Sequence, residues 1–182
     1  MAPPVRTSRQ AWIDAALATL SESGADAIRV ELLAAELGVT RGGFYRQFTG
    51  RQMLLDAVLD AWERRGIDEV RERVEQEGGD AATKVRRAGR LTFSKDLLRI
   101  DLAVREWARR DPAVAARLVR VDNRRMDYLR NLIGTISDDP QDVEARSLLL
   151  FSLVIADHLI AADHPTGTRA QVIENATRLI LD

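Results

Sequence analysis

Apolar residues recur at helical spacing along almost the whole chain, with polar residues between them. Valine, isoleucine and threonine never gather into an alternating run, so the pattern predicts helices and no sheet. Glycines, prolines and capping residues mark the expected helix ends. The predicted fold class is therefore all-α, with about nine helices, over residues 8–23, 30–37, 41–48, 51–76, 80–93, 96–110, 113–135, 141–162 and 168–181.

The stretch "GVTRGGFYRQF", residues 38–48, places two adjacent glycines inside one of these short helices. A glycine in a helix interior costs about 1 kcal/mol relative to alanine. The segment around it has helix-turn-helix proportions, with Gly38 at the turn and the Thr40 hydroxyl expected to cap the second helix. Since the second helix of this motif enters the DNA major groove, Gly42 and Gly43 are predicted to let the backbone approach the bases closely.

The distribution of charge supports a DNA-binding segment, although the total charge does not. Lys and Arg number 27 against 28 Asp and Glu, so the chain is nearly neutral. Residues 37–55 nevertheless hold three arginines and no acid, and residues 1–13 add Arg6 and Arg9, again without an acid. Contact with phosphates is the expected use of this charge, and a solvated basic loop is the alternative.

Other classes of protein receive less support from the sequence. The absence of cysteine excludes a disulfide framework, a thiolate zinc site and a cysteine nucleophile. No Ser/His/Asp or lysine-based arrangement is readable, so an enzyme is a minor alternative, as is a helical adaptor without DNA. Asp157, His158, Asp163 and His164 raise the question of a metal. The two histidines fall roughly 120° apart around a helix, so we predict no metal and no cofactor.

No membrane segment is expected. The first ten residues contain no apolar stretch of the kind found in signal peptides. The longest apolar run, residues 148–156, is far shorter than the ~20 residues that a bilayer needs. The default expectation is a cytoplasmic protein with no membrane partner.

Residues 12–62, "WIDAALATLSESGADAIRVELLAAELGVTRGGFYRQFTGRQMLLDAVLDAW", resemble the N-terminal domain of TetR-type (tetracycline repressor-like) transcriptional regulators. Residues 105–133 are similar to the middle of the second domain in many members. The resemblance implies a three-helix DNA-binding domain over residues 1–50 and a helical ligand-binding and dimerisation domain over 51–182. The family pattern matches at Ala15, Ala16, Gly24, Leu33, Ala34, Gly38, Val39, Thr40, Gly43, Tyr45, Phe48 and Leu54.

The resemblance also implies particular DNA contacts. Thr40 and Tyr45 would contact phosphates, and so would Arg51, which stands where the family usually has lysine. The side of the second motif helix that faces the major groove or its rim would present Arg41, Gly42, Gly43 and Arg46.

Three nearby positions need separate treatment. Arg29 departs from the hydroxyl residue that often begins the second helix; arginine is a poor N-cap, and it could reach a phosphate instead. Phe48 is predicted to be core. Phe44 is open between packing and contact with a thymine methyl group.

The last two helices are predicted to form a homodimer interface, as they do in the family. Residues 148–155 are apolar on every side, so the helix over 141–162 is expected to be buried all round, partly by its own subunit and partly by a partner. A monomer with a central helix is the alternative. The helix over 168–181 contributes an apolar stripe of Val172, Ile173, Ala176, Leu179 and Ile180.

Large side chains of the middle helices are candidates for an effector site, although residues of this kind are more often core. Few charged residues are expected at inner positions, so the predicted effector is an apolar or aromatic small molecule. The function predicted from the family is a homodimeric transcriptional repressor that an effector releases from operator DNA, with an activator as the alternative. The candidate effector residues are Trp62, Phe93, Trp107, Met126, Tyr128 and Phe151.

Overall fold

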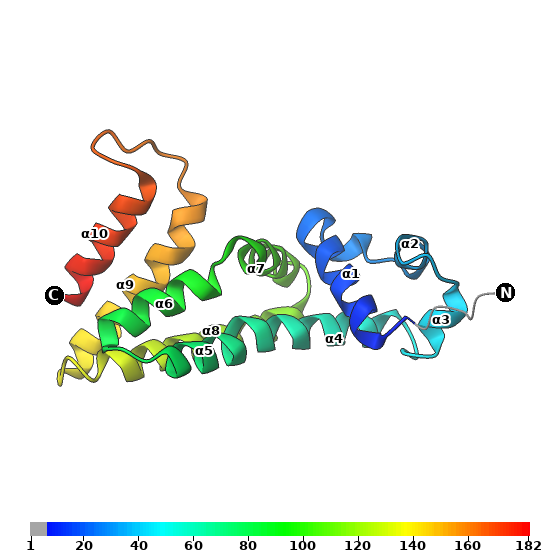
Figure 1. Ribbon diagram of the computed structural model, residues 1–182, viewed down its shortest axis with the longest axis horizontal. Helices are drawn as coiled ribbons and strands as arrows, with labels where there is room; N and C mark the ends of the chain where they lie inside the picture. The colour runs from blue at the N-terminus through cyan, green and yellow to red at the C-terminus, as the bar shows by residue number, and fades with distance from the viewer. Residues whose placement is uncertain (1–6) are drawn as a thin grey trace. The chain divides into compact units, whose positions relative to one another are not determined.

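The computed structural model describes residues 7–182, apart from the side chain of Asp157. Within these residues every expected helical segment is present and no strand occurs, which confirms the all-α prediction (Figure 1). The helix bounds are α1 Arg9–Ser23, α2 Val30–Glu36, α3 Arg41–Tyr45, α4 Arg51–Glu63, α5 Glu69–Glu77, α6 Ala81–Thr92, α7 Lys95–Ala108, α8 Pro112–Ile133, α9 Pro140–Leu159 and α10 Arg169–Leu181.

The helix predicted over 51–76 is interrupted, which the sequence pattern did not indicate. A π-helical turn over Arg64–Asp68 divides it into α4 and α5. A π turn adds a residue to the helical turn and so shifts the phase of the apolar positions that follow it. Gly66 and Ile67 are buried within this turn.

Two glycines end helices as the sequence predicts. Gly24 follows α1 at φ 78°, and its amide donates to the Leu20 carbonyl at 3.0 Å. Gly38 follows α2 at φ 65°. Side chains other than glycine rarely adopt this left-handed conformation, so both positions favour glycine for a local reason.

The helices gather into two compact units. The first comprises the described residues up to Asp68 together with Lys95–Val119, and the second comprises Glu69–Ser94 together with Arg120–Asp182. In the first unit α1 packs against both α4 and α7. The predicted functional boundary between residues 50 and 51 stays a prediction. The fully buried large side chains of the first unit include Trp12, Leu20, Ile28, Leu33, Leu54, Val58, Trp62 and Val104.

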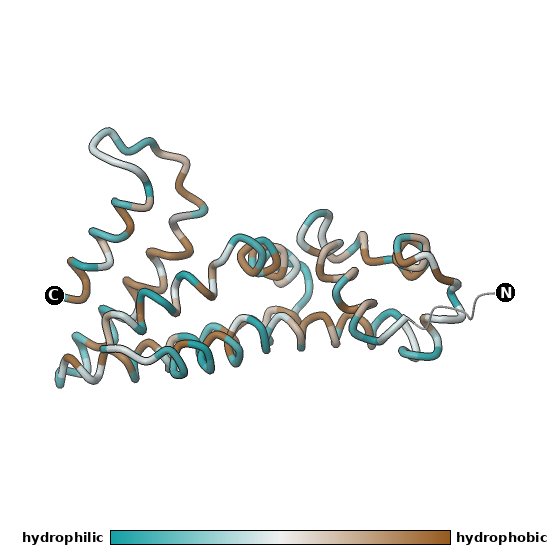
Figure 2. The backbone as a smooth tube through the Cα atoms, viewed as in Figure 1, coloured by the Kyte–Doolittle hydropathy of each residue, from teal (hydrophilic) through white to brown (hydrophobic). Residues whose placement is uncertain are grey.

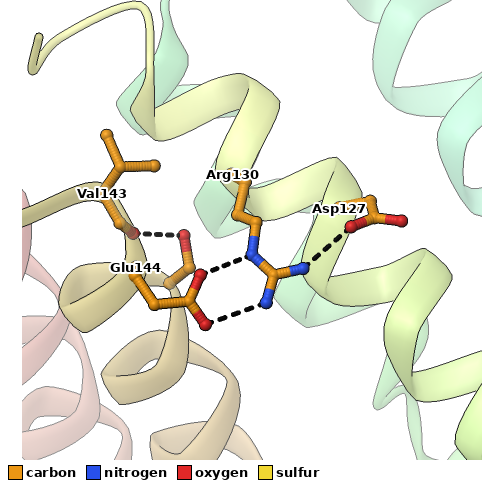
Figure 3. Close-up of polar contacts among 5 residues, drawn as sticks. Asp127, Arg130, Val143 and Glu144 are labelled. Atoms are coloured by element: carbon orange, nitrogen blue, oxygen red, sulfur yellow. Dashed lines mark hydrogen bonds and ion pairs between the residues drawn. The ribbon is translucent and has the colours of Figure 1, made fainter. Parts of the chain in front are cut away.

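In the second unit α9 packs along α10, and their contact includes buried Leu150 and Leu181. A charged link joins α8 to α9: Arg130 donates through Nε and Nη2 to the two oxygens of Glu144 at 2.6 and 2.8 Å (Figure 3). The same guanidinium donates to Asp127 at 2.8 Å. These bonds from Arg130 hold the pKa of Glu144 below its ordinary value.

The sequence predicts burial of α9 on all sides, but in a single chain one side is buried and another is exposed. Ser147 and Leu150 face inward and are buried, whereas Leu148 and Leu149 are each 55% exposed. Figure 2 shows apolar positions along much of α9. Cover for the outer face by a second subunit stays a prediction.

Candidate nucleic-acid interface and effector site

The short helix α3 is anchored through its aromatic residues. The Phe44 side chain is fully buried and meets the Trp12 ring edge-to-face, with the centroids 5.3 Å apart. It also stacks on Phe48 at 5.2 Å, and Phe48 is buried as predicted. Aromatic pairs at this spacing stabilise a core beyond their area alone. The structure therefore assigns Phe44 to packing and not to contact with a base.

With Phe44 facing inward, the other side of α3 is exposed. We call its exposed residues, Thr40, Arg41, Gly42, Tyr45 and Arg46, the reading surface. Tyr45 is 55% exposed, although its ring keeps an edge contact with Phe44 at 5.2 Å. The structure thus brings together on one short helix most of the residues predicted to contact DNA.

The predicted cap of α3 by the Thr40 hydroxyl is wrong. Thr40 occupies the N-cap position with an extended backbone, but its side chain accepts no capping bond. The reason is that the Gly43 amide, one of the amides that a capping hydroxyl would use, donates to the Thr40 backbone carbonyl at 2.9 Å. The Thr40 side chain is exposed beside Arg41.

Arg29 behaves as its residue type predicts. It is the N-cap of α2 and makes no side-chain capping bond. Its side chain is exposed, so the phosphate contact considered for it stays a prediction.

The two glycines of α3 have different surroundings. A Cβ on Gly42 would approach only the exposed Thr40 hydroxyl, at 3.6 Å. A Cβ on Gly43 would instead meet the Trp12 ring and Val39 side chain at 3.9 Å. Gly43 therefore faces Trp12 and Val39, with room for a Cβ at ordinary van der Waals distance. Close approach to DNA stays a prediction for both glycines.

Arg51 has a structural role that sequence reasoning missed. Its Nε donates to the Ile28 carbonyl at 2.7 Å, and its Nη2 donates to the Ala25 carbonyl at 2.8 Å. The first residue of α4 thereby holds the turn that precedes α2. The sequence signal for this role is an arginine at a position where the TetR-type pattern usually has lysine. The forked guanidinium of arginine can bind two acceptors at fixed geometry, which lysine cannot. Two of its five N–H donors are used in this way, and the predicted phosphate contact would use the other three.

The charge of Arg41 is partly balanced by an acid from outside the arginine-rich stretch. Its Nη2 lies 3.2 Å from Glu31 Oε1, and both side chains are largely exposed. The pKa of Arg41 is raised, first by its hydrogen bond with Tyr45 and then by the charge of Glu31. Arg9 lies over the Phe48 ring at 4.8 Å, which places a second cation at this domain's N-terminal end. Arg6 lies outside the described residues.

The candidate effector residues fall in both units. Trp62 and Trp107 belong to the first unit. Trp62 is buried, and its indole Nε1 donates to Asp101 Oδ1 at 3.1 Å. The other oxygen of Asp101 pairs with Arg105 Nε at 2.8 Å. Trp107 is half-buried. Trp62 therefore has a definite structural partner, and its predicted role in an effector site is untested.

In the second unit Phe93 and Phe151 lie together, with centroids 6.4 Å apart. The Arg125 guanidinium lies 5.8 Å from the centre of the Phe93 ring. Met126 is buried. Tyr128 points its hydroxyl to Glu75 Oε1, at 2.9 Å, and burial, followed by this bond, raises the pKa of Tyr128.

The sequence predicts few charged residues at inner positions, and two charged side chains are buried among the described residues. Asp101 in α7 is only 1% exposed, and Arg125 in α8 is only 7% exposed. Both occur at helical spacing from apolar residues, and this pattern could have indicated their burial. Each charge has a nearby opposite charge, with Arg105 beside Asp101 and Asp122 beside Arg125.

The described residues contain no group of three or more histidine, cysteine, aspartate or glutamate side chains that could hold a metal ion. The side chain of Asp157, one of the four possible metal ligands considered from the sequence, lies outside the described part of the structure. None of the helices between residues 7 and 182 combines the length and apolar character needed to cross a membrane.

Comparison with known proteins agrees with this geometry. Residues 13–58 match the family described as bacterial regulatory proteins, tetR family. A structure of a TetR-family transcriptional regulator from Streptomyces coelicolor is 22% identical, with a TM-score of 0.74, covering 96% of each chain. A protein of unknown function from Rhodococcus sp. RHA1 is 21% identical, with a TM-score of 0.73, covering 100% of this chain and 97% of that chain.

A third similar structure is AibR in complex with isovaleryl coenzyme A and operator DNA. It is 16% identical, with a TM-score of 0.68, covering 94% of this chain and 96% of that chain. Among curated proteins, none matches the sequence. Residues 13–58, which contain the α2–α3 helix-turn-helix, are the part of the chain that matches the TetR family. This match confirms the resemblance found in that part of the sequence.

Proposed function

We propose that this chain is a homodimeric transcriptional repressor that binds operator DNA through its reading surface and leaves it when a small-molecule effector binds. The observation that carries the proposal is the orientation of α3. Phe44 is locked inside against Trp12, so Arg41, Tyr45 and Arg46 are turned outward together. A short helix that presents cations and a phenol in this way fits the major groove and its phosphate rim.

A homodimer is supported by the exposed apolar face of the last two helices. Leu148 and Leu149 are more than half exposed, and so are Leu159 of α9 and Leu179 of α10. Apolar side chains at helical spacing on an exposed face are typical of an interface. Two subunits would place their reading surfaces about 34–36 Å apart, to match successive major grooves of a pseudo-palindrome.

The effector site is proposed around Phe93 and Phe151, which could hold an apolar or aromatic group. The Arg125 guanidinium, which pairs with Asp122, also lies beside the Phe93 ring. One solved protein of the same fold holds both an acyl coenzyme A and operator DNA, which supports a response to ligands. For release, the effector must bind the DNA-competent and DNA-incompetent conformers with different affinity. The site of action would be the cytoplasm, and no catalytic role is proposed.

The DNA part of the proposal is tested by sequencing genomic DNA that the purified protein retains. A duplex carrying the recovered sequence should bind with strong salt dependence. Replacing Arg46 with Ala should reduce the slope of log K against log salt by about one unit for each phosphate that the arginine neutralises. The control is Arg109→Ala, an exposed cation that directly follows α7. No binding by the parent, or equal slopes in both variants, would contradict the assignment.

Assembly is tested by sedimentation of Leu148→Glu. The side chain is exposed in one chain, so the variant should fold, whereas a charge in the proposed interface should yield monomers that bind operator poorly. A folded dimer with parental affinity would contradict the interface.

The effector part needs a compound first, from a thermal-shift screen. Phe151→Leu should then bind DNA like the parent but respond less to the compound. Unchanged affinity for the compound would place the site elsewhere.

A further inference from the structure

Glu31 is the one acid in contact with the reading surface in the described structure. It lies in the first turn of α2, and its Oε1 is 3.2 Å from Arg41 Nη2. Arg41 is the first residue of α3. Two side chains from two helices thus form one exposed ion pair, Glu31–Arg41, on the surface proposed to meet DNA.

A contribution to folding stability does not account for the Glu31–Arg41 ion pair. Its side chains are 59% and 58% exposed, and exposed ion pairs add little to folding stability. On a DNA-binding surface a carboxylate is also unfavourable in general, because it repels phosphates within a Debye length of about 10 Å. An acid at this position therefore calls for a role in recognition.

The geometry allows two connected effects. A guanidinium has five N–H donors, so the contact with Glu31 leaves others for DNA. Held by Glu31, Arg41 has fewer orientations in which to reach arbitrary phosphates, while it can still offer donors to a guanine edge. In addition, the charge of Glu31 opposes binding wherever the protein contacts only backbone phosphates.

We propose that Glu31 is a specificity-determining residue, which positions Arg41 for base contact and weakens binding to DNA of unrelated sequence. This inference rests on the proposed function of the reading surface. It assigns to α2 a part in sequence preference, whereas the sequence predicts base contacts from α3 alone.

The test uses a library of randomised duplex DNA as the probe, with sequencing of the bound fraction and titration of the unselected library. Glu31→Gln keeps the size of the side chain and removes its charge. We expect the variant to bind the unselected library about two- to fivefold more tightly per subunit, as for one repulsive charge at several ångströms. The selected sequences should become less sharply defined in each half-site.

Two further variants separate this role from general charge or folding effects. Glu36→Gln removes an exposed charge from the other end of the same helix and should leave both measurements near parental values. In an Arg41→Gln background, Glu31→Gln should no longer change the base preference, because Glu31 acts on it through Arg41. A structural role alone would not produce this dependence.

The outcomes are distinguishable. If the parent selects no sequence and does not bind the library, the proposed function fails and Glu31 loses its role with it. If the parent binds and selects but Glu31→Gln behaves like the parent or like Glu36→Gln, only the inference about Glu31 is overturned. The same conclusion follows if the preference still changes in the Arg41→Gln background.

Discussion

The indole N–H of Trp62 in α4 donates to the carboxylate of Asp101 in α7, across 3.1 Å, with both side chains almost completely buried. The bond connects two helices of the unit that contains the helix-turn-helix motif. Arg105 supplies the opposite charge on the other carboxylate oxygen. Since a buried carboxylate needs its partners, this relationship should contribute to the stability of the unit.

Trp62→Phe should lower the free energy of unfolding by about 1–3 kcal/mol beyond the effect of its smaller ring on packing, because it removes a donor from a buried acceptor. Trp12→Phe is a matched control, since Trp12 is equally buried and its Nε1 has no hydrogen-bond partner among the described residues. Urea denaturation followed by circular dichroism measures both. Equal destabilisation would show that the bond to Asp101 contributes nothing beyond packing.

Arg51→Ala should destabilise the N-terminal domain by roughly 1.5–3 kcal/mol, a range typical of hydrogen bonds to charged groups. The physical reason is the removal of the two bonds to the Ile28 and Ala25 carbonyls. Arg46→Ala, on the exposed side of α3, should leave stability nearly unchanged while weakening DNA binding. Chemical denaturation of the two variants distinguishes these roles, and a stable Arg51→Ala protein would argue against the structural assignment.

The glycines of α3 should respond to substitution in opposite ways. Gly42→Ala should stabilise the helix by up to about 1 kcal/mol and weaken DNA binding, because the new methyl group lies on the exposed side. Gly43→Leu should destabilise by about 1–3 kcal/mol through overpacking against Trp12 and Val39. Thermal unfolding together with DNA titration checks both. If Gly43→Leu retains parental stability, its side chain does not face the core.

The Arg130–Glu144 link should make stability depend on pH. Because its folded-state pKa is lowered, Glu144 stabilises the fold above its unfolded-state pKa, and this contribution is lost as pH falls through the folded-state value. Glu144→Gln should therefore have a lower Tm than the parent at pH 7. The difference should shrink from about pH 5 downward, as carboxylates with ordinary pKa near 4.3 become protonated in the parent. A difference that stays constant to pH 3 would contradict the assignment.

Local features of the sequence determined much of what the structure confirms. Helix periodicity and caps predicted the helices, because both depend on residues within one or two turns of each other. Gly24 and Gly38 were predictable as helix ends for the same reason, since their left-handed conformations are local. The TetR-type motif likewise lies in one continuous segment, residues 13–58.

Only the tertiary structure decided which partners the individual side chains have. Phe44, left open by the sequence, is buried because Trp12 of another helix covers it. The same packing turns Gly43 inward. Arg51 finds its two carbonyls more than twenty residues away, and Glu31 reaches Arg41 across the turn between two helices. Such contacts depend on how helices pack in three dimensions, and the spacing of residues along one helix does not contain that information.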